Sequence, residues 1–131
     1  MENLHIKGTI KSPTLEFDFD NGVLAISGRS HPEHAINIYE PALQWLDEYS
    51  KNPKPLTIVN VSLEYFNTSS SKVIFDIFRR LEKLHAAGNK VLVKWHYEED
   101  DDDLREEGEM FSELVKVPIE LVSVKEFDFS W

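Results

Sequence analysis

The chain has 131 residues, 41% of them hydrophobic, so it can fold as a single domain spanning residues 1–131 around a substantial core. It contains no cysteine, which excludes disulfide bonds, thiolate metal sites and cysteine nucleophiles and favours a cytoplasmic setting. Its formal net charge of −10 argues against binding to nucleic acid and favours a protein partner with a basic or apolar docking surface. The first ten residues lack the apolar stretch of a signal peptide, and no apolar run is long enough to cross a membrane, so we expect no membrane insertion.

The N-terminal part of the chain predicts short β-strands. Residues 4–7 form the first, and residues 14–19 alternate apolar and polar side chains with the period of a strand. Asp20-Asn21-Gly22 then supplies a tight turn, because Asn-Gly tolerates the positive φ that such a turn requires. Residues 23–28 return as the second arm of a β-hairpin.

A helix is predicted after this hairpin. Ser30 is a candidate N-cap, Pro32 falls in the first turn, and the helix is expected to end near residues 49–52. Pro41 lies inside it and is expected to kink or split the helix, because its ring displaces the carbonyl four residues back. The apolar stripe of this helix consists of Ile36, Tyr39, Leu43 and Leu46.

Strands and helices alternate in the rest of the chain. Val91, Leu92 and Val93 are consecutive apolar residues, as in a covered central strand. The order β-β-β-α-β-α-β-α-β predicts an α/β sandwich, with a mixed sheet, an N-terminal hairpin at its edge and helices packed on it. The expected elements are a buried strand at 56–63, a helix at 73–84 closed by Gly88, a strand at 90–95, a short helix at 104–111 and a strand at 119–124.

Four consecutive hydroxyl residues, Thr68, Ser69, Ser70 and Ser71, follow Asn67 where a strand passes into a helix. This position exposes them, and a helix N-terminus supplies free backbone N–H groups and positive dipole character. Hydroxyls there can cap the helix, bind an anion or carry a phosphate. Four hydroxyls exceed the need of one cap, and the residues themselves leave capping and modification both open.

The acidic run at residues 98–103 suggests a Ca²⁺ or Mg²⁺ site at first sight. It lacks the alternating ligands and the central glycine of an EF-hand loop. We interpret it as a solvated loop or a partner-docking segment, in which Asp102 or Asp103 caps the helix that starts at Leu104.

No pattern in the chain assigns catalytic residues, a cofactor or a metal. His31 and His34 could share a helix face, but no HExxH pattern accompanies them. The GxSxG elbow, the P-loop and the GxGxxG fingerprint are all missing.

The aromatic residues are expected mostly in the core. Trp45 lies between Leu43 and Leu46, beside the buried stripe of its helix. An exposed tryptophan there would serve as an interface anchor, and a buried one would belong to the core; the pattern favours the core.

Three segments together resemble the SiaC family of bacterial regulatory phosphoproteins, and the likeness covers nearly the whole chain. In chain order they are Gly28-Arg29-Ser30-His31-Pro32-Glu33, then Tyr65-Phe66-Asn67-Thr68-Ser69-Ser70-Ser71-Lys72, then Trp95-His96-Tyr97-Glu98-Glu99-Asp100-Asp101 with Gly108-Glu109. The middle segment is the most specific of the three.

The resemblance implies a STAS-like fold similar to anti-sigma factor antagonists, and a partner switch. In such systems a Ser/Thr protein kinase phosphorylates one hydroxyl at the start of the second helix, and a PP2C-type phosphatase removes the phosphate. The unmodified form binds and activates a diguanylate cyclase, which raises cyclic di-GMP and promotes biofilm or aggregate formation. The family's phosphorylated residue falls on Thr68. Asn67, Ser69, Ser70 and Ser71 would surround this site and cap the helix, and the serines would also shape the kinase contact.

We therefore predict a non-enzymatic phospho-switch protein with Thr68 as its switch. Two alternatives remain open, namely an anti-sigma factor antagonist with a transcriptional partner and a small metal-dependent hydrolase that uses the acidic loop. The candidate partner-binding residues are Tyr65, Phe66, Lys72, Trp45, Glu98 and Asp100.

Overall fold

A six-stranded mixed sheet forms the frame of the protein, whose computed structural model describes residues 1–129. The strands lie side by side in chain order. The first three pair antiparallel, and β3 to β6 are mutually parallel. They are β1 (Leu4–Ile6), β2 (Thr14–Asp18), β3 (Val23–Ser30), β4 (Leu56–Phe66), β5 (Lys90–Glu98) and β6 (Ile119–Val124).

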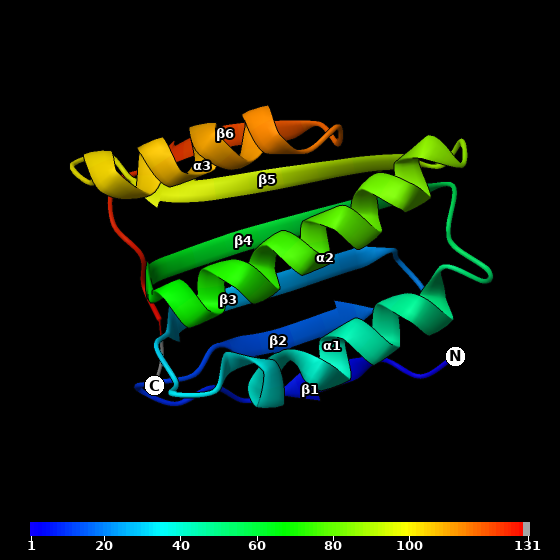
Figure 1. Cartoon of the computed structure of the whole chain (residues 1–131), viewed down its shortest axis with the longest axis horizontal. Coiled ribbons are helices and arrows are strands. Elements are labelled where there is room, and N and C mark those ends of the chain that lie inside the picture. The colour runs from blue at the N-terminus through cyan, green and yellow to red at the C-terminus, as the bar shows by residue number, and fades with distance from the viewer. Residues whose placement is uncertain (130–131) are drawn as a thin grey trace.

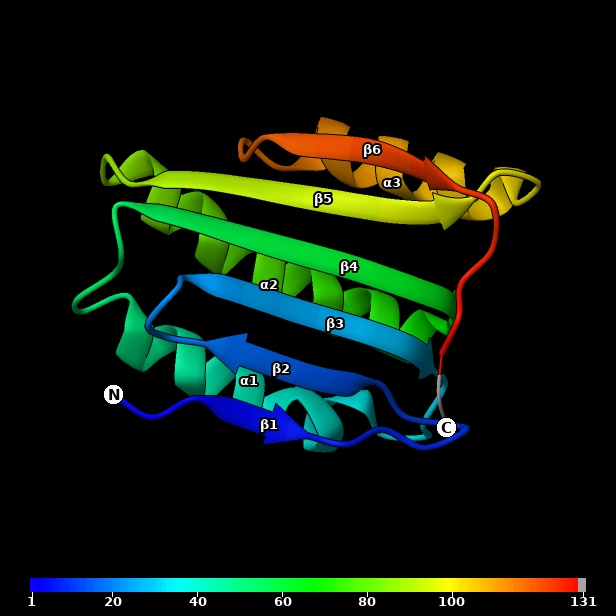
Figure 2. The same ribbon diagram turned by 180° about the vertical axis from the view of Figure 1, so that it is seen from behind.

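The three helices of the described chain all cover one face of this sheet (Figures 1 and 2). They are α1 (Ala35–Tyr49), α2 (Thr68–Ala86) and α3 (Asp102–Leu114). Each helix connects two adjacent parallel strands, and every connection steps in the same direction across the sheet. Because such crossovers are right-handed, the three helices must lie on the same face. The predicted α/β order and the mixed sheet are confirmed.

The N-terminal hairpin is confirmed, with β2 and β3 as its arms. Gly22 has φ +64°, and its N–H donates to the carbonyl of Phe19 at 3.2 Å. A Cβ at this position would lie 2.6 Å from the carbonyl oxygen of Leu56. Both the backbone conformation and the close approach therefore require glycine.

The strand and helix on either side of the hydroxyl run are longer than predicted. β4 extends to Phe66 and α2 begins at Thr68, so Asn67 is the only residue between them. At its other end α2 closes as predicted at Gly88, where φ is +103°. The N–H groups of Gly88 and Asn89 donate to the carbonyls of His85 and Leu84, the paired bonds of a Schellman motif.

The N-cap expected for α1 is wrong. Ser30 does not cap it, because Ser30 is the last residue of β3; the N-cap position is His34, whose side chain makes no capping bond. Pro41 does not split the helix, which is continuous from Ala35 to Tyr49. Proline at this position leaves one carbonyl without its partner, that of the exposed Asn37, which water can reach.

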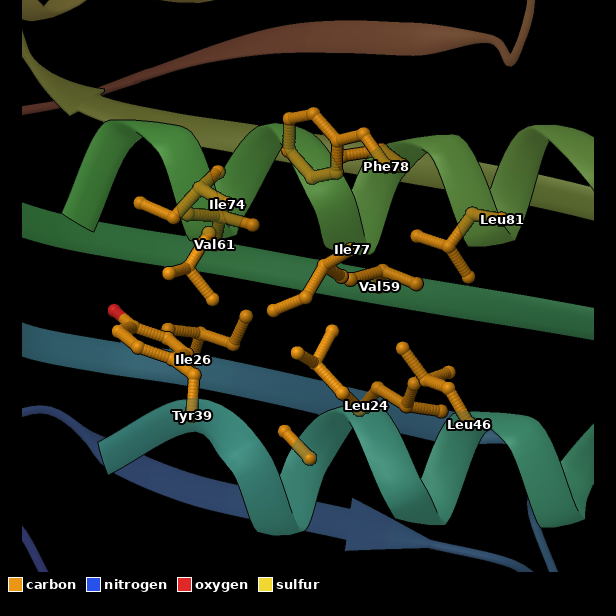
Figure 3. Close-up of a cluster of buried hydrophobic side chains, with 14 of the residues drawn as sticks. Leu24, Ile26, Tyr39, Leu46, Val59, Val61, Ile74, Ile77, Phe78 and Leu81 are labelled. Atoms are coloured by element: carbon orange, nitrogen blue, oxygen red, sulfur yellow. The ribbon is translucent and has the colours of Figure 1, made fainter. Parts of the chain in front are cut away.

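The core lies between the sheet and the helices (Figure 3). Alternate residues of the strands point into it, including Leu24, Ile26, Val59 and Val61, and the apolar stripes of α1 and α2 cover them. The covering side chains include Tyr39, Leu46, Ile74, Ile77, Phe78 and Leu81. Burying this apolar surface supplies the main driving force for folding.

A tryptophan fixes the position of α3. Trp95 of β5 is 1% exposed, and its indole N–H donates to the carbonyl of Leu104 at 2.9 Å. The same ring lies under Gly108, where an added Cβ would come within 2.5 Å of it. Phe111 packs on the ring from the next turn of the helix, with 5.5 Å between centroids.

The opposite face of the sheet is covered by no helix of residues 1–129 (Figure 2). The prediction of a covered strand therefore holds for one face of β5 alone; Leu92, between two buried valines, is only partly buried. Polar side chains of neighbouring strands contact each other on this face. His96 Nε2 lies 3.1 Å from Asn60 Oδ1, and burial lowers the pKa of His96.

None of the described helices is both long and apolar enough to cross a membrane.

The packing of α3 on Trp95 predicts that Gly108→Ala destabilises the fold. In an open helix this substitution would stabilise the protein by up to about 1 kcal/mol. Here the new methyl group overlaps the indole, so we expect the free energy of unfolding to fall by about 1–3 kcal/mol in urea denaturation. Glu113→Ala, at an exposed position of the same helix, is the control and should change it by less than about 0.5 kcal/mol. A stabilised Gly108→Ala variant would contradict this packing.

Candidate functional site

The sequence-predicted site residues, apart from Trp45, gather at one edge of the sheet. β3, β4 and β5 end there, and the helices that follow them begin there (Figure 1). The edge therefore carries the hydroxyl run at the start of α2, the end of β4, and the acidic run between β5 and α3. We call it the C-terminal edge.

A bulge at the end of β4 sets which aromatic side chain points outward. The register between β3 and β4 shifts by one residue between Gly28 and Arg29, so that Arg29 pairs with Tyr65. The shift leaves Glu64 as an extra residue without a partner in β3. Beyond Glu64, the side chains of β4 that would have pointed inward point outward, and the reverse. As a result Phe66 turns inward, 5.9 Å from the ring of Trp95, and Tyr65 turns outward, 51% exposed.

Asn67 is the cap of α2. Its Oδ1 accepts from the N–H of Ser70 at 2.9 Å, and its Nδ2 donates to the carbonyl of Pro32 at 3.0 Å. Its own N–H donates to the carbonyl of Ser30. Of the four residues expected at the helix cap, Asn67 occupies the cap position, and Ser69, Ser70 and Ser71 do not.

Ser70 belongs to a buried chain of hydroxyl groups. Its hydroxyl donates to the carbonyl of Ser30 at 2.9 Å and accepts from the hydroxyl of Ser30 at 2.7 Å. Because the Ser30 hydroxyl donates its one proton to Ser70, it can only accept from Tyr39. The Tyr39 hydroxyl, 2.8 Å from Ser30 Oγ, is therefore the donor in that contact. Burial raises the pKa of Tyr39, which keeps it protonated for this role.

Ser69 makes a hydrogen bond to the start of α1. Its hydroxyl accepts from the N–H of Ala35 at 3.1 Å, and so it satisfies one of the free N–H groups at the start of α1. The start of α2 is therefore tied to the start of α1 through Ser69, to the loop before α1 through Asn67, and to the end of β3 through the Ser30–Ser70 pair.

Thr68 differs from its neighbours. It is exposed, and its hydroxyl makes no hydrogen bond to any residue in the range 1–129. Ser71 is partly buried and Lys72 is exposed, while Ser70 is 0% exposed. Of the four hydroxyls, that of Thr68 is both the most accessible and free of a structural task.

The residues of the acidic run have different surroundings. Glu98 Oε2 accepts from the N–H of Phe127 at 3.0 Å, and Asp100 is exposed at the turn. Asp101 caps α3 by accepting from the N–H of Leu104, so the expectation that Asp102 or Asp103 is the cap is wrong by one or two residues. Among residues 1–129 no group of three or more His, Cys, Asp or Glu side chains is arranged to hold a metal ion.

Trp45 lies apart from this edge, in the core, as the pattern favoured. Its side chain is 8% exposed and stacks on Tyr49 at 4.9 Å between ring centroids. Its indole N–H donates to the carbonyl of Glu2. The alternative use of Trp45 as an exposed interface anchor does not agree with this burial.

Sequence patterns missed the parts played by Ser30 and Tyr39. Ser30 and Ser70 are 40 residues apart, and neither lies in a motif that pairs them. The one indication in the sequence is that Ser30 and Ser70 each lie in a segment that resembles the same family.

Residues 6–124 match the family described as SiaC family regulatory phosphoprotein. The chain belongs to this family. A relative in Pseudomonas aeruginosa (strain UCBPP-PA14), the uncharacterized protein PA14_02130, is 33% identical over 119 residues, which cover 90% of this chain and 94% of the relative.

Solved structures of SiaC from Pseudomonas aeruginosa share the fold. One covers 95% of this chain and all of its own length, with 30% identity and a TM-score of 0.87. A second is the diguanylate cyclase SiaD in complex with its activator SiaC; the matched chain has the same identity and TM-score, and the match covers 92% of this chain and 99% of that one.

The different surroundings of Ser70 and Thr68 predict a large loss of stability for one substitution and almost none for the other. Ser70→Ala removes a buried donor and leaves the Ser30 hydroxyl without its acceptor, so we expect the free energy of unfolding to fall by about 1–3 kcal/mol. Thr68→Ala should change it by no more than about 0.5 kcal/mol. Urea denaturation of the two variants measures both values, and equal losses would contradict the assignment of the hydroxyls.

Proposed function

We propose that the unmodified protein binds and activates a diguanylate cyclase, and that phosphorylation of Thr68 blocks this binding. The observation that carries the proposal is the match, over nearly the full length of both chains, to a SiaC that has been solved in complex with the cyclase it activates. Activation would raise cyclic di-GMP and promote biofilm or aggregate formation. The protein would act through binding in the cytoplasm and not as an enzyme.

The exposed hydroxyl of Thr68 supports its choice as the phosphorylated residue. A kinase must reach the hydroxyl oxygen, and only an accessible side chain allows this without unfolding the helix start. Ser70 would have to leave its buried bonds with Ser30, and Ser69 would have to release the N–H of Ala35. Modification at either serine would therefore cost hydrogen bonds that modification at Thr68 does not.

The backbone around Thr68 also supports a phosphate there. The N–H groups of Thr68 and Ser69 have no acceptor among the described residues, and they lie at the positive end of the α2 dipole. A phosphate would add a charge of about −1.5 to −2 at this end, where the dipole stabilises it. The helix should thus stay folded after modification, and the change is confined to the surface.

The proposed block is both steric and electrostatic. Unmodified Thr68 lies within the docking surface, beside Tyr65 and Lys72, both of which are exposed. A phosphate on Thr68 disturbs the fit of that surface and changes its charge. A Ser/Thr protein kinase would add the phosphate and a PP2C-type phosphatase would remove it, which completes the switch.

The location of the phosphate can be measured directly. In fragment mass spectrometry of the protein from its native host, we expect a single phosphate on Thr68 that disappears after phosphatase treatment. A phosphate on Ser71 would retain the switch and move its site. A phosphate on neither residue in several growth states would overturn the proposed regulation.

Charge at Thr68 is expected to weaken cyclase binding. By calorimetry, Thr68→Ala should bind the cyclase about as tightly as the unmodified protein, and Thr68→Asp at least about tenfold less tightly, a difference of about 1.4 kcal/mol. The rate of cyclic di-GMP synthesis should fall in parallel. Ser50→Asp places the same charge at the far end of α1 and should bind normally. Equal affinity of Thr68→Asp and Thr68→Ala would contradict the proposal.

A further inference from the structure

A small depression lies at the C-terminal edge between the end of β4 and the first turns of α3. Its volume is about 240 Å³, below the range of roughly 300–1,000 Å³ that small-molecule sites occupy. It has room for one inserted side chain of a partner protein. The residues that line it are Glu64, Tyr65, Phe66, Asp101, Asp103, Leu104 and Glu107.

The apolar part of the depression comes from two strand residues and one helix residue. Leu104 is 8% exposed, and Phe66 is held on Trp95. Tyr65 stands half exposed beside them because of the bulge in β4. Half-exposed aromatic rings of this kind offer a face on which a flat, weakly hydrated group can stack.

The charged part of the depression is entirely acidic, and two of its carboxylates have no counter-charge. Arg105, the one basic residue of α3, pairs with Asp102 and Glu109 at 3.6 and 2.8 Å. Asp103 and Glu107 line the depression and have no ion-pair partner among residues 1–129. They lie four residues apart on one helix, a spacing at which like charges repel each other. A cation seated between them would relieve this repulsion.

We infer that this depression receives an arginine side chain of the partner protein. The inference rests on the proposed function, since it names the chemistry by which the cyclase would dock. A guanidinium group is planar, stacks on aromatic faces and donates two parallel hydrogen bonds to a carboxylate, so it matches both the Tyr65 ring and the carboxylates. A lysine ammonium would satisfy the charge alone.

The preference for a guanidinium can be tested without the cyclase. The probe is N-acetyl-arginine methylamide, added to the isotope-labelled protein and followed by amide chemical shifts. We expect saturable shifts centred on Tyr65, Phe66 and Leu104, and much weaker ones with the corresponding lysine and citrulline amides. Citrulline keeps the shape of arginine without its charge. Shifts that are absent, scattered over the surface or equal for all three probes would overturn the inference.

Two double variants with the same loss of charge then test the role in partner binding. D103N/E107Q neutralises the carboxylates in the depression, and E106Q/E113Q neutralises two carboxylates of α3 that lie outside it. We expect D103N/E107Q to weaken cyclase binding roughly tenfold and to reduce the dependence of binding on salt. E106Q/E113Q should leave the affinity and its salt dependence nearly unchanged. Circular dichroism confirms that both variants fold.

The outcomes separate this inference from the proposed function. If both double variants bind the cyclase equally well, the depression does not receive an arginine of the cyclase, although the protein still binds the cyclase. If the unaltered protein binds no cyclase, the proposed function fails, and with it the choice of this partner.

Discussion

The hydrogen bonds between Ser30 and Ser70 are the constraint on which the candidate site depends. They join the last residue of β3 to the third residue of α2, and both side chains are buried. Buried hydroxyl groups destabilise a fold unless they are paired, and here the hydroxyl of Tyr39 completes the pairing. The rotation of α2 about its axis is thereby fixed at its first turn. With Ser70 directed inward, Thr68 must lie on the opposite side of the helix, toward solvent.

Local patterns were sufficient to predict the architecture. The Asn-Gly turn, the alternation in 14–19 and the glycine at 88 each act within a few residues, and each is found where the pattern placed it. The order of the elements then allowed few topologies, because right-handed connections between adjacent parallel strands leave little choice. The same rule shows why β5 is covered on one face alone. Three helices on one face leave the other face open, and the run of apolar residues at 91–93 does not show which face is covered.

The candidate site was only partly predictable, because contacts between distant residues decide it. The sequence presents four adjacent hydroxyls as equivalent, and it is Ser30, 40 residues away, that engages Ser70. Ala35 likewise engages Ser69. The bulge that turns Tyr65 outward arises from the pairing of β3 with β4, and its only local mark is Gly28 of β3, with φ +104° at the register shift. The resemblance to a family pointed to Thr68, and the fold supplies a physical reason for the same choice.

The proposed switch has to work at short range. The protein already carries a net charge of −10, so a phosphate of about −2 changes its long-range field by only about a fifth. At physiological ionic strength that field decays over about 8 Å. A basic docking group would moreover be attracted by a more negative protein. In this proposal the block therefore comes from contact, because the phosphate disturbs the surface beside Tyr65. A phosphate at the far end of α1 would add equal charge and leave binding intact.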